Sequence, residues 1–99
     1  MNKLDLSKLT KITSFSSGYI SGGSDYWVMY DFPENPTILL VNSSGSNGGW
    51  EYESWEYIDK PSEKILAQFI NEDFAEIEKC KLILSLERKS IYLLGIDKP

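Results

Sequence analysis

The sequence predicts an α+β fold: a mainly antiparallel sheet of about five to six strands, with one long amphipathic helix before a C-terminal β-hairpin. Three observations predict it. Strand-like runs follow one another up to Asp59, apolar residues then recur with helical spacing from Ile65 to Ile77, and two strand-like runs occupy residues 81–96. A chain of 99 residues is expected to form a single domain, residues 1–99.

The first quarter of the chain predicts a turn, a strand and a loop. Apolar residues from Leu4 to Phe15 predict a short helical turn near Ser7 followed by a strand. Residues 16–25 are rich in serine and glycine, a composition typical of a flexible loop or hairpin. A loop of this length could place residues 19–20 at a binding rim.

Two further strands are predicted in the centre of the chain. Residues 26–32 are rich in β-forming residues and are stopped by Pro33 and Pro36. Residues 37–41 are a near-continuous apolar run, which favours a central strand covered on both faces. Residues 42–49 contain mostly serine, asparagine and glycine and predict an eight-residue loop.

Residues 50–59 are expected to form the next antiparallel strand. Successive side chains of a strand point to opposite faces, so even-numbered residues share one side and odd-numbered residues share the other. The aromatic side chains lie on the even-numbered side before Ser54 and on the odd-numbered side after it. Either a β-bulge lies near Ser54, or neither face of this strand is purely core.

The C-terminal part predicts a helix and a hairpin. Pro61 marks the start of the helix, and apolar residues at spacings of three and four continue it to about Lys79. Residues 71–73 could instead cap a second short helix. Residues 81–96 alternate in a way that predicts a hairpin with its turn at residues 88–89.

The charge is negative overall and unevenly distributed. The net charge is −5, and residues 31–78 carry eleven acids against two lysines, whereas residues 79–99 carry five bases against two acids. An acidic chain is unsuited to direct contact with nucleic acid, which requires lysine and arginine, or with anionic membranes. The expected partner is therefore a protein with a basic surface, with no direct nucleic acid and no membrane contact.

The residues needed for common kinds of catalysis are missing, so the protein is expected not to be an enzyme. There is no histidine, the commonest general base and metal ligand, and no acid-rich loop with the spacing of a calcium site. We expect no catalytic residue, no metal site and no cofactor. The single cysteine, Cys80, and the absence of a signal-peptide pattern or an apolar membrane span predict a cytoplasmic protein.

Residues 50–59 hold four large aromatic residues and four acids, the strongest bias in the chain. Aromatic side chains are enriched among the residues that dominate binding energy, and acids accelerate association with cationic surfaces. We predict that Trp55 and Tyr57 anchor a partner while the acids pair with its basic residues. The predicted partner-binding residues are Glu51, Glu53, Trp55, Glu56, Tyr57 and Asp59. In the alternative, Trp50 and Tyr52 are sheet core and the acids a solvated edge.

Small size, missing catalytic groups, an acidic centre and an aromatic strand together resemble, in type, the immunity proteins of bacterial polymorphic and contact-dependent toxins. That resemblance implies a cytoplasmic protein that neutralises one cognate toxin, a nuclease with a basic cleft, by forming a stoichiometric complex. The resemblance assigns no role to any individual residue of this chain. Three alternatives stay open: a phage-type mimic of nucleic acid, an adaptor or subunit of a larger assembly, and a small enzyme or sugar-binding module.

Overall fold

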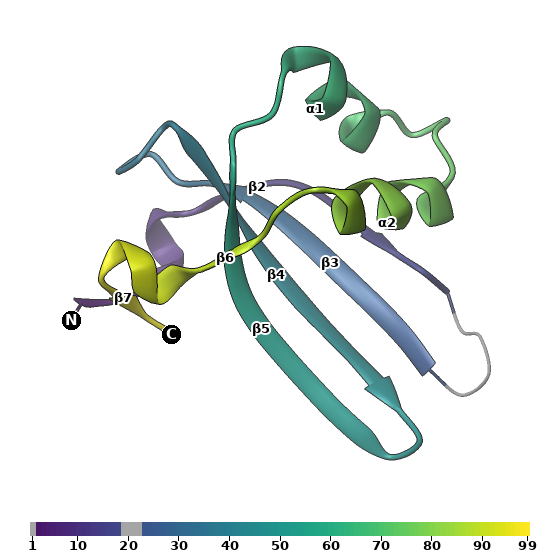
Figure 1. The fold of residues 1–99 in the computed structure, drawn as a ribbon, viewed down its shortest axis with the longest axis horizontal. Coiled ribbons are helices and arrows are strands. Elements are labelled where there is room, and N and C mark those ends of the chain that lie inside the picture. The colour runs from purple at the N-terminus through teal and green to yellow at the C-terminus, as the bar shows by residue number, and fades with distance from the viewer. Residues whose placement is uncertain (1, 19–22) are drawn as a thin grey trace.

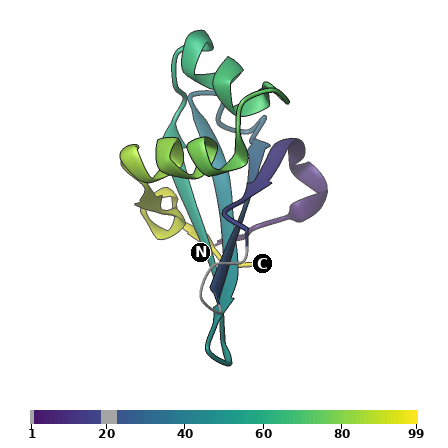
Figure 2. The same cartoon turned by 90° about the vertical axis from the view of Figure 1, so that its right-hand side faces the viewer.

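The computed structural model describes residues 2–18 and 23–99 of the chain and shows an α+β fold (Figures 1 and 2). Five strands form one antiparallel sheet in the order β2-β3-β4-β5-β6, and β1 pairs with β7 in a separate parallel pair. In chain order the elements are β1 (Asn2–Lys3), the 3₁₀ turn η1 (Leu6–Lys8), β2 (Thr10–Ser16), β3 (Gly23–Asp31), β4 (Ile38–Asn47), β5 (Trp50–Asp59), α1 (Glu63–Ile70), α2 (Glu76–Ser85), β6 (Lys89–Ser90), the 3₁₀ turn η2 (Ile91–Leu94) and β7 (Ile96–Asp97).

The predicted antiparallel sheet is confirmed, but the predicted loop over residues 42–49 is wrong. β4 continues through this segment to Asn47, because it has a hydrogen-bonded neighbour on each side, β3 and β5. The connection to β5 is only two residues long. Gly48 and Gly49 have φ angles of +57° and +90°, as a type I′ turn requires. Of the predicted loop over residues 16–25, residues 19–22 lie outside the described part of the chain.

The single long helix and the terminal hairpin are also wrong. α1 begins after Ser62, whose hydroxyl accepts a hydrogen bond from the Ile65 N–H, and it ends at Ile70. After a five-residue break, α2 runs through residues 76–85, although a strand was expected from residue 81 onward. The leucine-rich segment supports a helix because Leu82, Ile83 and Leu86 pack together at helical spacing against the sheet. In place of the hairpin, two strands of two residues each follow: β6 at the edge of the main sheet and β7 beside β1.

One face of the sheet, called here the helix face, packs against α1 and α2. Its core contains Phe15, Trp27, Met29, Leu39, Val41 and Ile58 from the sheet and Phe69, Cys80 and Ile83 from the helices. On α1, Phe69 belongs to the apolar spacing that predicts a helix. On α2, Ile77 of that spacing is 42% exposed, and the buried Ile83 comes from a segment predicted as a strand.

The opposite face, called here the terminal face, packs against the two ends of the chain. Its core contains Leu4, Phe32, Ile38, Leu40, Trp55, Tyr57 and Ile91. β1 and β7 bring the ends together, with Asn2 opposite Ile96 and Lys3 opposite Asp97. The labelled N and C termini accordingly lie close to each other in both views (Figures 1 and 2).

The β4–β5 hairpin is covered on both faces near its base and projects beyond the cover at its turn (Figure 2). Trp55, Tyr57 and Ile58 are buried, whereas residues 50–53 are all exposed. The register between β4 and β5 is regular from Ile38–Asp59 to Asn47–Trp50. The change of aromatic sides near Ser54 is therefore not caused by a bulge. The second explanation is correct: neither face of this strand is purely core, because each carries exposed and buried side chains.

In the part of the chain that the structure describes, no helix combines the length and the apolar character needed to cross a membrane.

Candidate functional site

The candidate site is the projecting end of the β3–β4–β5 sheet, where large side chains surround a run of small ones. Strand register places Tyr52 beside Gly45 and Asp25, and Glu53 beside Ser44 and Tyr26. We call this region the acidic tip and define it by Asp25, Tyr26, Trp50, Glu51, Tyr52 and Glu53.

The alternation of the strands divides the acidic tip between the two faces of the sheet. Trp50, Tyr52 and Asp25 lie on the helix face, beyond the end of the core under the helices. Glu51 and Glu53 lie on the terminal face, on the same side as Tyr26. The tip therefore presents aromatic side chains on both faces, with the two glutamates together on one of them.

Exposure of large aromatic side chains is the most unusual property of the tip. Trp50 is 80% exposed, and Tyr26 and Tyr52 are each 44% exposed. Gly45 lies opposite Tyr52 on β4, and Ser44 lies opposite Tyr26, so both tyrosines have a small neighbour. A shallow open depression is lined by Ser44, Gly45, Ser46, Glu51, Tyr52 and Glu53. Tyrosine and tryptophan in such positions provide rigid contact area with few rotatable bonds.

A hydrogen bond from the Tyr52 hydroxyl to the Asp25 carboxylate joins β5 to β3 across β4. Burial of part of the phenol raises the pKa of Tyr52, and the Asp25 acceptor raises it further. Tyr52 is accordingly protonated at neutral pH and able to donate this bond, which holds its ring against the outer end of the sheet.

Because folding raises the pKa of Tyr52, the stabilisation linked to its protonation is complete below its pKa in the unfolded chain, about 10. This stabilisation is lost as pH rises through the higher pKa that Tyr52 has in the folded protein. Replacement of Asp25 by asparagine is expected to lower the pKa of Tyr52 part of the way, because burial, the larger cause, stays. Carbon-13 NMR titration of the tyrosine ring carbons measures this shift, with Tyr52→Phe identifying the signal. An unchanged Tyr52 pKa in Asp25→Asn would contradict the assigned hydrogen bond.

Within residues 2–18 and 23–99, no ion pair neutralises the acids of the acidic tip. Residues 23–29 and 42–55 contain no lysine or arginine. Other acids form ion pairs, which in the described part of the chain are Lys8–Glu34, Lys60–Asp31, Lys81–Glu78, Arg88–Glu56 and Lys89–Asp59. Among the described residues, Glu51 and Glu53 take part in no ion pair.

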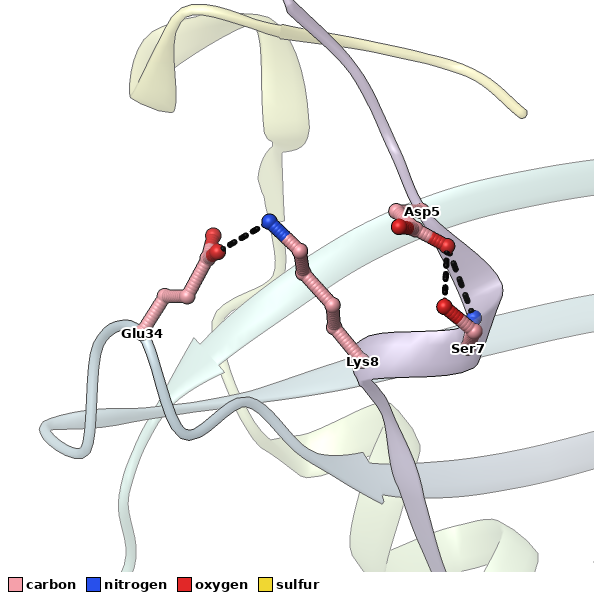
Figure 3. A network of polar contacts seen from close by, with 4 residues as sticks. All are labelled: Asp5, Ser7, Lys8 and Glu34. Atoms are coloured by element: carbon pink, nitrogen blue, oxygen red, sulfur yellow. Dashed lines mark hydrogen bonds and ion pairs between the residues drawn. The ribbon is translucent and has the colours of Figure 1, made fainter.

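The charges near the N-terminus provide a contrast (Figure 3). The Asp5 carboxylate accepts hydrogen bonds from the hydroxyl and the N–H of Ser7, and Lys8 Nζ lies 2.7 Å from Glu34 Oε1. The Ser7 hydroxyl bond lowers the pKa of Asp5, and the Glu34 hydrogen bond raises the pKa of Lys8. These charged groups have partners within the chain, whereas the glutamates of the tip form no ion pair with any residue that the structure describes.

Two of the six predicted partner-binding residues are in the core, where the expected exposure of the anchors is wrong. Trp55 is 6% exposed and Tyr57 8% exposed, both within the terminal-face core. The terminal segments cover this side of β5, which the sequence of the strand itself cannot reveal. Trp50 and Tyr52, expected in the alternative to be sheet core, are the exposed aromatic residues of the strand.

Two predicted acids form ion pairs with the chain after α2. Glu56 Oε1 lies 3.6 Å from Arg88 Nε, and Asp59 Oδ2 lies 3.0 Å from Lys89 Nζ. Arg88 also donates to the Ile83 and Leu86 carbonyls at the end of α2 and lies over the Trp27 ring. Glu51 and Glu53 are the two predicted residues that lie at the acidic tip.

The structure adds four residues that the predicted site omitted: Trp50, Tyr52, Tyr26 and Asp25. The sequence carries one signal for two of them. Asn47–Gly48 is a turn signal, and a tight turn there would have made the serine-rich segment a strand opposite Trp50 and Tyr52. Within the described ranges, no group of three His, Cys, Asp or Glu side chains is arranged to hold a metal ion.

No protein-family model, no curated protein sequence and no solved structure matches this chain.

Proposed function

We propose that this protein acts in the cytoplasm as a stoichiometric inhibitor, neutralising a cognate toxin by covering a basic surface of it, such as the active-site cleft of a nuclease. The acidic tip is the binding site. Glu51 and Glu53 steer onto and pair with lysine or arginine of the toxin, while Trp50 and Tyr52 bury against it. This assignment replaces the buried Trp55 and Tyr57 as anchors.

The proposal is supported above all by one observation: Trp50 is 80% exposed at a projecting tip whose glutamates form no ion pair with a described residue. Tryptophan and tyrosine dominate binding energy in many interfaces when they enter pockets of the partner. Uncompensated acids raise the rate of association with a cationic surface and select against acidic partners.

The cytoplasmic part of the proposal rests on Cys80, whose thiol is unpaired and buried. Burial raises the pKa of Cys80, which favours the protonated thiol over the reactive thiolate. A fold that buries a reduced thiol in its main core is suited to a reducing compartment.

The immobilised protein is expected to capture one basic toxin or nuclease from a lysate of its own organism, and equimolar protein should abolish that partner's activity. Capture is compared at about 0.1 M and about 1 M salt, where the Debye length falls from about 10 Å to about 3 Å. Trp50→Ala should weaken binding by about 2 kcal/mol or more, and Glu51→Gln/Glu53→Gln should mainly slow association at low salt.

Matched controls are Leu93→Ala, which truncates another strongly exposed apolar side chain, and Glu72→Gln/Glu87→Gln, which removes the same charge elsewhere. Both should bind like the unaltered protein. If the Trp50 variant and its control bind the partner with equal affinity, the acidic tip is not the binding site.

The second candidate function is that of an adaptor or subunit in a larger assembly. It is favoured by exposed apolar side chains on the outer side of α2, where Ile77 is 42% and Leu84 59% exposed. In that case the captured complex is expected to resist high salt and to be lost in Ile77→Ala/Leu84→Ala, with the tip variants unaffected.

A further inference from the structure

The outer edge of β5 is unpaired at the acidic tip. β5 pairs with β4 along its whole length, whereas β6 pairs with it only at Glu56 and Tyr57. Within the described residues, Trp50–Ser54 therefore have a strand neighbour on one side only. Figure 1 shows this edge of the hairpin, which continues toward the turn beyond the short pairing with β6. An exposed strand edge offers backbone donors and acceptors to another chain.

The register indicates which backbone groups point outward. The type I′ turn makes Asn47 and Trp50 a hydrogen-bonded pair, and such pairs alternate with non-bonded ones along antiparallel strands. Trp50, Tyr52 and Ser54 thus bond to β4. The N–H and C=O groups of Glu51 and Glu53 point away from β4, along the open edge.

The other edge of the sheet, β2, is protected against pairing with another chain, whereas the β5 edge at the acidic tip is not. β2 has an irregularity in its pairing between Lys11 and Thr13, and it carries a lysine. The Thr13 hydroxyl donates to the Phe69 carbonyl at the end of α1, which ties the helical layer to this strand. Bulges, lysines and covering segments are the usual protection of sheet edges. The stretch Trp50–Ser54 has a regular register and no lysine or proline.

The side chains along the open edge define what fits there. In an added strand, alternate side chains would lie on the terminal face, within about 5 Å of Glu51 and Glu53. Lysine or arginine at every second position would neutralise both glutamates. A second copy of this chain does not fit, because antiparallel pairing of two β5 edges would place Glu51 and Glu53 opposite the same acids.

We propose that the partner docks by adding an extended strand with alternating lysine or arginine residues to the β5 edge at Trp50–Ser54. This inference rests on the proposed function and specifies how the acidic tip is engaged. Backbone hydrogen bonds to Glu51 and Glu53 give the affinity, and the two carboxylates select basic side chains.

The test is amide hydrogen exchange of the nitrogen-15-labelled protein with a synthetic probe peptide, acetyl-Thr-Lys-Val-Lys-Thr-amide, at millimolar concentration. Exchange of the Glu51 and Glu53 amides is expected to slow by at least about tenfold. The Tyr52 and Ser54 amides, already bonded to β4, should change little. The same peptide with glutamate in place of lysine should not bind.

Two results overturn the edge proposal. One is binding of the lysine peptide without added protection at Glu51 and Glu53, which would indicate contact with side chains alone. The other is absence of binding. Neither result removes the proposed function, which is judged by capture of the partner and its dependence on Trp50, so the two ideas fail separately.

A pair of variants at Glu53 separates the contribution of the backbone N–H to peptide binding from that of the carboxylate charge. Glu53→Pro and Glu53→Gln both remove the carboxylate, but only the proline removes the outward N–H. Peptide affinity is expected to fall about fivefold or more in Glu53→Pro relative to Glu53→Gln. Equal affinities, in a proline variant whose spectrum is that of the folded protein, contradict strand addition. The exchange measurement needs no variant and stands if the proline variant does not fold.

Discussion

Truncation of Trp55 to alanine is expected to lower the free energy of unfolding by about 3–5 kcal/mol, as removal of a buried aromatic side chain does in other cores. The Trp55 ring is 6% exposed and stacks on Tyr30 at a centroid distance of 5.7 Å. Its indole N–H has no hydrogen-bond partner among the described residues, so the truncation removes no hydrogen bond to them. Equilibrium denaturation in urea, followed by circular dichroism, measures the change.

Trp50→Ala is the matched control, since it removes the same side chain from the same strand at an exposed position. Its expected change in stability is within about 0.5 kcal/mol. The two variants also separate folding from binding, because Trp50 is expected to affect affinity and Trp55 stability. Comparable unfolding midpoints for the two variants would mean that Trp55 does not belong to the terminal-face core.

Replacement of Phe69 by alanine is the second large effect, again with an expected loss of about 3–5 kcal/mol. Phe69 is fully buried and its ring stacks on Phe15 at 5.6 Å. α1 is only eight residues long, too short to be stable in isolation, so it depends on this contact with the sheet. The variant should lose helical ellipticity at lower denaturant than the unaltered protein.

Ile70, the next residue, is 48% exposed and provides the control. Ile70→Ala should change the free energy of unfolding by less than about 1 kcal/mol. A side chain that is about half exposed buries little apolar surface, so its truncation removes little hydrophobic stabilisation. A large effect at Ile70 with a small one at Phe69 would indicate that α1 is rotated from the orientation described above.

Local pattern predicted the fold class and the early strands because proline, β-branched and aromatic residues act within a few positions. The predictions were wrong where contacts with distant segments of the chain determine the local secondary structure. Asn42–Asn47 has the composition of a loop, yet two long neighbouring strands hold it in the sheet. Residues 81–87 alternate like a strand, but residues 81–85 form the second half of α2, because Leu82 and Ile83 pack against the sheet.

Of the six predicted partner-binding residues, Glu51 and Glu53 lie at the acidic tip and the other four do not. Alternation correctly divided the side chains of residues 50–59 between two faces. It could not show that the chain termini cover Trp55 and Tyr57, nor that Arg88 reaches back to Glu56. Both facts depend on contacts between segments tens of residues apart, which periodicity within one strand does not encode.

The pairing of β1 with β7 has a consequence for the order of folding. Asn2 lies opposite Ile96, so this contact closes a loop of nearly the whole chain, whereas β4 and β5 join through two residues. Closing a long loop has a larger entropic cost than closing a short one. We expect the β4–β5 hairpin to form early and the terminal-face core to assemble last, so that the acidic tip takes its shape before the two ends of the chain meet.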